Sequence, residues 1–410
     1  MSGFQRNAKG EACLGGARLA DLLDQAGVGT PAYVYDLDAI HEGARAMVAE
    51  LGPAPNEVAY AIKANSAGSI VRTVARAGAG AEVVSRGELE VALGAGVPPD
   101  RISTTSVAKQ DHELDALIGA GVRVIQLESV EEVPRIAARA RALGATARIA
   151  FRVNPAVSID THAHVATGHE DAKFGVALAD IGAAFALADA EPSLRVVGVG
   201  AHVGSTLKTV ESYLTSARVV LEVARARRAA GGSLSQVDFG GGFGIDYGPG
   251  PLPAPVEYLR AARRLVQESG LADLAIVVEP GRSMVAAHGV LVSSVIQSKR
   301  GRGRSWAFLD AAMNDLVRPA LYGARHRIEP LDQLPAAPAW SVAGPVCESA
   351  DVFGEHELGD PLPRRVVIRD AGAYGFAMAS EYNGRALPAE VFVSGGRVAH
   401  VSPSPGRDAW

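Results

Sequence analysis

Short apolar, β-prone runs recur between residues 58 and 279 and alternate with longer segments of helical character. The runs that we interpret as strands are Val58–Ala64, Ala81–Ser85, Arg101–Thr105, Val122–Glu128, Ala147–Asn154, Val196–Val203, Gln236–Phe239 and Leu274–Glu279. The segments between them, such as Val130–Leu143 and Val210–Ala230, are rich in Ala, Leu and Arg, which favour helices. Strands alternating with helices predict an α/β fold with parallel pairing. A closed (β/α)8 TIM barrel is the natural arrangement, and an open doubly wound sheet is the alternative.

The pattern changes after about Ala286, where strand-like runs follow one another with little helix between them. These runs are Val290–Gln297, Ser305–Asp310, Trp340–Val346, Arg365–Arg369, Glu390–Val393 and Arg397–Val401, the last two joined by the tight turn Ser394-Gly-Gly396. A short helix is expected around Ala17–Ala26, and Tyr33–Tyr35 is expected to add a strand. We therefore predict a barrel domain at 38–285 and a mostly antiparallel β domain built from 1–37 and 286–410.

The composition excludes several classes of protein. A net charge of -5 over 410 residues gives no basis for binding nucleic acid or an anionic membrane. Two cysteines, Cys13 and Cys347, cannot form a disulfide framework and suit a reducing compartment. No signal peptide and no apolar run of membrane-spanning length is visible. We expect a cytoplasmic protein with a small-molecule substrate, and we expect no metal site.

Lys63 is an unusual residue at the end of a buried strand. Ammonium groups are rarely buried without a partner, so the lysine either reaches the surface, pairs with an acid, or serves as an amine nucleophile towards an aldehyde. The other strand ends carry matching chemistry. The seventh strand leads into Asp238-Phe-Gly-Gly-Gly-Phe-Gly244 and the eighth into Glu279-Pro-Gly-Arg282. Consecutive glycines expose backbone N–H groups to an anion, and barrels commonly bind phosphate at these two loops.

Two further residues complete a recognisable set. Glu279 is either an ion-pair partner of Lys63 or Arg282, or a carboxylate that keeps a heteroaromatic nitrogen protonated. His202 ends the sixth strand and is either structural or stacked on a flat ring. A lysine, a phosphate loop, an acid and a stacking histidine together predict pyridoxal phosphate as cofactor.

The motifs of the chain resemble those of the alanine-racemase-fold (type III) pyridoxal-phosphate decarboxylases, and within them the diaminopimelate decarboxylases. The resemblance runs from Tyr33 to Val393. Its motifs are Tyr60-Ala-Ile-Lys-Ala-Asn65, His202-Val-Gly-Ser205, Gly240-Gly-Gly242, Glu279-Pro-Gly-Arg-Ser283, Met313-Asn-Asp-Leu-Val-Arg-Pro-Ala-Leu-Tyr322, Gly344-Pro-Val-Cys-Glu-Ser349, Asp370-Ala-Gly-Ala-Tyr374 and Tyr382-Asn-Gly-Arg385. It implies decarboxylation of meso-2,6-diaminopimelate to L-lysine and CO₂, the last step of lysine biosynthesis. It also implies a homodimer with shared active sites.

The resemblance also implies a role for each site residue. Lys63 would carry the cofactor as a Schiff base, His202 would lie over its ring, and Glu279 would pair with the ring nitrogen. The phosphate would be surrounded by Ser205, Gly241, Gly242, Gly281 and Arg282. The distal carboxylate of the substrate would be received by Arg282, Arg318 and Tyr322. Cys347 and Glu348 would enter from the partner subunit, Cys347 as the acid, and Tyr374 would contact cofactor or substrate.

Three positions depart from the family pattern. The family commonly has Gln at the position of Thr206, Gly at that of Ala312 and a Tyr near Arg325. These departures remove no catalytic group but leave room for a related decarboxylase of another amino acid: a D-amino acid, an ornithine- or arginine-like one, or a carrier-bound one. A racemase of the same fold and a non-catalytic cofactor-binding protein are further alternatives.

The choice of substrate depends on Arg318. Its planar guanidinium fits a distal carboxylate through two contacts, whereas a distal ammonium would need an acid at this place. The alternative for Arg318 is a salt bridge to Asp310 or Asp315. The alternative for Cys347 is a small buried apolar residue.

Overall fold

A computed structural model describes residues 3–157, 173–248 and 250–404. Its backbone divides into two compact units. One unit comprises Ala44–Gly244 and Leu252–Gly281, and the other comprises Met1–Gly43, Ile245–Pro251 and Arg282–Trp410. The domain boundaries that we predict at residues 38 and 285 stay a prediction. Each unit is described by itself below.

The first unit is a closed parallel barrel. Its strands are β5 (Glu57–Ala61), β6 (Gly80–Val83), β7 (Ile102–Thr104), β8 (Val124–Leu127), β9 (Ala147–Asn154), β11 (Leu194–Gly200), β12 (Gln236–Asp238) and β13 (Ala275–Val278). Neighbouring strands pair in the order β9, β11, β12, β13, β5, β6, β7, β8, and β8 pairs with β9 to close the ring. The predicted (β/α)8 barrel is therefore confirmed, and the open-sheet alternative is wrong.

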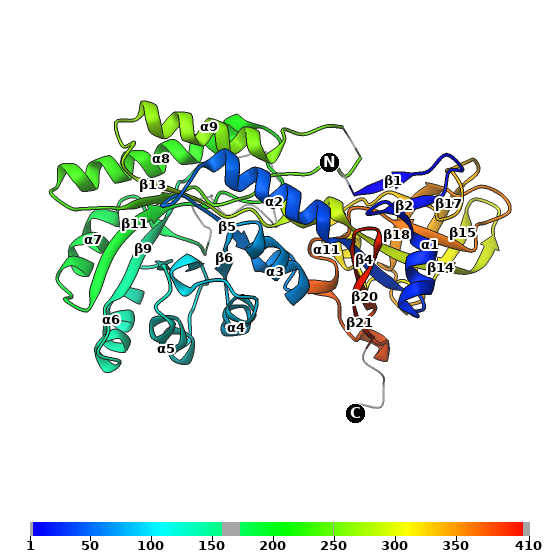
Figure 1. Cartoon of the computed structure of the whole chain (residues 1–410), viewed down its shortest axis with the longest axis horizontal. Helices are drawn as coiled ribbons and strands as arrows, with labels where there is room; N and C mark the ends of the chain where they lie inside the picture. Colours follow the sequence, from blue (N-terminus) through cyan, green and yellow to red (C-terminus); the bar gives the residue numbers. More distant parts are fainter. Residues whose placement is uncertain (1–2, 158–172, 249, 405–410) are drawn as a thin grey trace. The chain divides into compact units, whose positions relative to one another are not determined.

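Helices cover the outside of this barrel, as Figure 1 shows for α3 to α9. They are α3 (Gly68–Arg76), α4 (Arg86–Gly94), α5 (Asp111–Ala120), α6 (Glu132–Ala142), α7 (Ile181–Asp189), α8 (Val210–Ala229) and α9 (Pro255–Glu268). The barrel strands are buried on both faces because helices lie outside and side chains fill the inside. All residues of β5, for example, are buried. A two-residue strand, β10 (Val176–Ala177), pairs with β9 alongside β11.

The second unit is built on a mostly antiparallel sheet. Its central strands are β4 (Ala32–Asp36), β14 (Gly289–Arg300), β15 (Ser305–Leu309), β17 (Ala339–Ala343), β18 (Val352–Glu357), β19 (Arg365–Ile368), β20 (Ala389–Ser394) and β21 (Arg397–Ser402). Strand β4 pairs with β14 and β20, so the segment around Tyr33–Tyr35 supplies a strand to this sheet as predicted. The β20–β21 hairpin is also confirmed. The pairs β4–β20 and β15–β17 are parallel.

Several elements of the second unit are additional to those predicted. They are β1 (Phe4–Arg6), β2 (Ala12–Leu14), β3 (Ala17–Arg18), β16 (Ile328–Pro330) and β18, of which β1 to β3 form a separate small sheet. The helices are α1 (Leu19–Ala26), α10 (Arg282–Val285) and α11 (Arg318–Tyr322), while α2 (Leu37–Leu51) continues into the barrel unit. Across the described residues, no helix has the length and apolar content that crossing a membrane would need.

Candidate active site

Lys63 follows strand β5 directly, in the single 3-10 turn Ile62–Ala64. Its Nζ atom forms an ion pair with Glu82, whose side chain on strand β6 is fully buried. Glu82 also accepts a hydrogen bond from the hydroxyl of Thr105. The Lys63 side chain is 38% exposed, so the amine can be reached while the carboxylate fixes its direction. Lys63 therefore pairs with an acid, which is one of the alternatives left open by the sequence, and the acid is Glu82.

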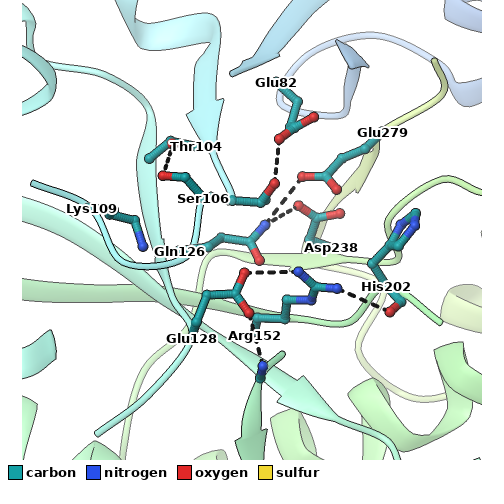
Figure 2. A network of polar contacts seen from close by, with 12 residues as sticks. Glu82, Thr104, Ser106, Lys109, Gln126, Glu128, Arg152, His202, Asp238 and Glu279 are labelled. Atoms are coloured by element: carbon teal, nitrogen blue, oxygen red, sulfur yellow. Dashed lines mark hydrogen bonds and ion pairs between the residues drawn. The ribbon is translucent and has the colours of Figure 1, made fainter. Parts of the chain in front are cut away.

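A buried polar network lies in the interior of the barrel (Figure 2), and Lys63 lines the same cavity. The Gln126 amide on β8 donates to Asp238 Oδ2 over 2.6 Å and lies 3.5 Å from Glu279 Oε1. Asp238 ends β12, and its Oδ1 accepts from the backbone N–H of Gly240 at 2.8 Å. Asp238 and Glu279 therefore present two neighbouring carboxyl groups to the same interior.

These two carboxyl groups hold protons more tightly than isolated acids. Burial raises the pKa of Glu279 well above its usual value, and the charges of Asp238 and Glu82 raise it further, whereas Lys63 opposes the shift. Burial also raises the pKa of Asp238, against the hydrogen bond from Gly240. Two acids in one apolar interior do not both ionise readily. The Glu279–Asp238 pair is therefore suited to hold a proton and share it with a basic nitrogen.

His202 lies just beyond strand β11 and is partly buried. Its Nδ1 atom accepts a hydrogen bond from the backbone N–H of Gly241 over 3.2 Å, which leaves the ring hydrogen on Nε2. Burial of the ring, with the charges of Arg152 and Lys63, lowers its pKa well below the usual value. His202 is thus a neutral, oriented ring rather than a cation.

The glycine-rich loop after β12 allows close approach of backbone to backbone. Gly242 has φ 92°, and a Cβ atom there would collide with the carbonyl oxygen of Gly204. A Cβ atom on Gly241 would likewise collide with the carbonyl oxygen of Glu279. Side chains are therefore excluded at these two positions for steric reasons, and a glycine-rich loop of this kind lets an anion approach the backbone closely. The partly buried Ser205 belongs to the loop after β11 that the Gly242 backbone touches.

A cavity of about 390 Å³ lies among these groups in the barrel unit. Its lining includes Lys63, Gln126, His202, Asp238 and Glu279. This volume is within the range of small-molecule sites. The residues fit pyridoxal phosphate, because an accessible amine, a flat neutral ring and a pair of acids with raised pKa values line this cavity, and the glycine-rich loop follows directly after Asp238.

Three members of this network were not predicted from the sequence. Glu82, Gln126 and Asp238 lie inside or at the end of predicted strands, and only the closure of the barrel reveals their common direction. A fourth, Arg152 on β9, forms a buried ion pair with Glu128 at 2.9 Å and donates to the backbone carbonyl of His202. A charged residue in an otherwise apolar strand was the available signal for Glu82 and Arg152.

A second cluster of site residues lies in the β unit, at helices α10 and α11. Arg282 Nη1 is 3.0 Å from the hydroxyl of Tyr247, and the guanidinium lies 4.7 Å from the centre of the Tyr374 ring. Tyr374 holds the left-handed conformation, with φ 55°. Arg282 is buried, whereas Tyr322 and Tyr374 are partly exposed. The sequence-predicted residues Arg282, Arg318, Tyr322 and Tyr374 are all in this unit.

Arg318 is the first residue of helix α11 and is buried. The sequence left open a salt bridge from Arg318 to Asp310 or Asp315, and the structure does not show one among the residues it describes. Asp310 instead accepts from Ser293 and from the backbone of Ser294, and Asp315 accepts from the backbone of Ala312. In the part of the chain that the structure describes, neither acid forms an ion pair with Arg318. The proposed salt bridge is therefore wrong.

Cys347 and Glu348 lie on a loop of the β unit. Both residues are exposed, so the interpretation of Cys347 as a small buried residue is wrong. The loop is fixed by Asp351, whose carboxylate accepts from the backbone N–H groups of Met313 at 2.7 Å and Val346 at 2.8 Å. The thiol is thus presented to the outside of this chain on an anchored segment.

The chain is similar to known decarboxylases over most of its length. Residues 37–286 match the family described as "Pyridoxal-dependent decarboxylase, pyridoxal binding domain". Diaminopimelate decarboxylase of Zymomonas mobilis is 38% identical over 91% of this chain and 90% of its own. The same enzyme of Neisseria meningitidis serogroup A is 39% identical over 90% of both chains.

A solved structure gives the same result. Diaminopimelate decarboxylase from Helicobacter pylori, complexed with L-lysine, has a TM-score of 0.88 at 33% identity and covers 95% of this chain and 97% of its own. The family match covers the residues that form the barrel network. The chain therefore belongs to the diaminopimelate decarboxylase family of pyridoxal-dependent decarboxylases.

Proposed function

We propose that this protein converts meso-2,6-diaminopimelate to L-lysine and CO₂. The observation that carries the substrate is the buried Arg318, which has no carboxylate partner among the described residues and lies in one cluster with Arg282. Such a cluster is suited to a carboxylate and unsuited to the distal ammonium of lysine, ornithine or arginine. Related decarboxylases complexed with L-lysine, from Helicobacter pylori and M. jannaschii, support the same product.

The residues of the barrel would hold the cofactor. Lys63 would bind it covalently through Nζ, His202 would lie against its ring, and Glu279 would share a proton with its ring nitrogen. The phosphate would be held by Ser205, Gly241, Gly242, Gly281 and Arg282. When bound, pyridoxal phosphate supplies an electron sink for the electron pair that CO₂ leaves behind.

The other residues would bind and orient the substrate. Arg318, Arg282 and Tyr322 would receive its distal carboxylate, and Tyr374 and Glu348 would contact the rest of the molecule. Fixing the distal end places one particular carboxylate at the reacting centre, which lowers the entropic part of the barrier. Cys347 would then donate its thiol proton to the carbon that has lost CO₂. Its exposed position fits a donor that serves a second copy of the chain.

Arg318→Lys tests the assignment of the substrate. Lysine keeps the charge but loses the planar two-point contact, and a charge-assisted hydrogen bond of this kind contributes about 1.5–3 kcal/mol. We expect kcat/KM for meso-diaminopimelate to fall about 10- to 100-fold, with cofactor absorbance unchanged. Arg300→Lys, an exposed arginine that pairs with Asp360, is the matched control. Normal activity of Arg318→Lys would refute the substrate while leaving a decarboxylase of another amino acid possible.

We further propose that two copies of the chain complete each other's active sites. Lys63→Ala and Cys347→Ala homodimers should each be nearly inactive, for different chemical reasons. When the two are mixed and refolded, half of the sites in each heterodimer contain both defects and half contain neither. Activity should therefore return to a fraction of the wild-type value. Heterodimers that form, as shown by native mass spectrometry, but remain inactive would contradict the shared site.

A cytoplasmic location stays part of this proposal. It is supported by the scarcity of cysteines, which suits a reducing compartment.

A further inference from the structure

One of the side chains that contact Arg318 is a histidine. Arg318 Nη1 lies 2.8 Å from His326 Nε2, and both residues are buried, at 4% and 3% exposure. Helix α11 ends at Tyr322, and the following Gly323 has φ 61°. The chain reverses there and brings His326 back against the first residue of the helix. The described residues include no ion-pair partner for Arg318. A buried guanidinium in this state is costly unless an anion joins it.

The tautomer of His326 follows from its second contact. His326 Nδ1 is 2.9 Å from the backbone carbonyl of Arg369. A carbonyl oxygen only accepts hydrogen bonds, so Nδ1 carries the hydrogen and donates it. Nε2 is then the acceptor, and the Arg318 guanidinium donates to it. Burial and the charge of Arg318 lower the pKa of His326 to about 3, so the ring is neutral near neutral pH.

Tyr247 holds the same guanidinium from another side. The Cζ atom of Arg318 lies 4.6 Å from the centre of the Tyr247 ring, and that ring meets His326 edge-on at 5.3 Å. The Tyr247 hydroxyl contacts Arg282. Neither of these two neighbours of Arg318 carries a carboxylate. They restrict the guanidinium without neutralising it.

We propose that His326 is a positioning residue that fixes Arg318 through a neutral hydrogen bond and so keeps its charge for a substrate carboxylate. This inference rests on the proposed function and deepens it, because it assigns the feature that makes the arginine cluster select a dicarboxylic amino acid. An acid at position 326 would accept the same hydrogen bond. It would also pair with Arg318 and compete with the substrate.

Three substitutions separate this role from simple packing. His326→Gln keeps a neutral acceptor, His326→Glu supplies a charged one, and His326→Leu supplies none. We expect the Glu and Leu variants to raise KM for meso-diaminopimelate about tenfold or more, with a much smaller change in kcat. The Gln variant should restore KM to within about threefold of the wild-type value by the same argument.

A matched control is available in the same unit. His356 is also a histidine with a pKa lowered by burial, and its Nε2 contacts the carbonyl of Phe353 at 3.0 Å. His356→Gln should leave KM unchanged. A KM of the Glu variant equal to that of wild type would overturn the proposal, as would a Gln variant as impaired as the Glu variant. Equal losses of kcat and thermal stability in all three variants, with KM constant, would show a packing role instead.

Calorimetry with pimelate, a seven-carbon dicarboxylate, separates this inference from the proposed function. Wild type and His326→Gln should bind pimelate with similar affinity. His326→Glu should bind it with a dissociation constant at least about tenfold higher. If the protein did not decarboxylate diaminopimelate but showed this binding pattern, the proposed function alone would fail. If wild type bound pimelate no better than His326→Glu, the role of His326 would fail.

Discussion

Replacing Lys63 with alanine is expected to reduce decarboxylation by on the order of 10³-fold or more, because both covalent capture of the cofactor and the acid–base work of the amine are lost. Lys63 is the accessible lysine of the barrel cavity, and Glu82 directs its amine. Lys109, by contrast, is fully buried in an ion pair with Glu132 at 2.9 Å. The measurement is CO₂ release from meso-diaminopimelate by the purified variant with added cofactor.

A chemical experiment on the wild-type protein gives an independent readout. Borohydride reduction of the protein loaded with pyridoxal phosphate should leave a pyridoxyl group on the peptide that contains Ala61–Ser66. Lys299→Ala, which changes an exposed lysine of strand β14, should retain both label and activity. A label on Lys109 or Lys173 would refute the assignment of Lys63.

The second large effect is expected for Glu279→Gln, which should lower kcat about 10²- to 10³-fold, as for the loss of one preorganised charge-stabilising group. The amide keeps the shape of the side chain, but it cannot share a proton with a ring nitrogen. A protonated ring nitrogen stabilises the negative charge of the transition state more than that of the ground state. The measurement is kcat under saturating substrate and cofactor.

The control for this variant is another buried acid. Glu390 accepts a hydrogen bond from the Tyr35 hydroxyl at 2.8 Å, and burial raises its pKa to about 7. Glu390→Gln makes the same chemical change outside the barrel cavity and should leave kcat within about threefold, as expected for a change that touches no reacting atom. If Glu279→Gln were no worse than this control, the acid pair would have no part in the reaction.

The barrel could be predicted because its strands have one simple signature. A strand that is buried on both faces is often a continuous apolar run, as in β13 (Ala-Ile-Val-Val), and β9 has the predicted bounds. Strand β18 was missed because its sequence, Val-Phe-Gly-Glu-His-Glu, is largely polar and partly exposed. Strand β16 has only three residues, too few for an alternating pattern to appear.

Candidate site residues could be predicted from the sequence where they belong to a local motif. They could not be predicted where only long-range packing brings them to the site. Lys63, His202 and Glu279 stand at strand ends, which is where barrel chemistry is expected. Gln126 and Asp238, however, are 112 residues apart and meet only because the barrel closes. His326 gives no sign in the sequence, since its role depends on which ring atom faces Arg318. Each of these residues is recognised by a contact with another residue of the candidate site, which no local pattern reports.

The most direct test of the central claim is the stoichiometry of one reaction. The purified protein, with pyridoxal phosphate, is incubated with meso-diaminopimelate, and CO₂ and L-lysine are quantified over time. L-lysine, L-ornithine and L-arginine are offered in parallel, with detection of the corresponding amines. The account predicts one CO₂ and one L-lysine for each diaminopimelate consumed, and no amine from the three basic amino acids. CO₂ release from a basic amino acid with none from diaminopimelate, or interconversion of enantiomers without CO₂, would contradict it.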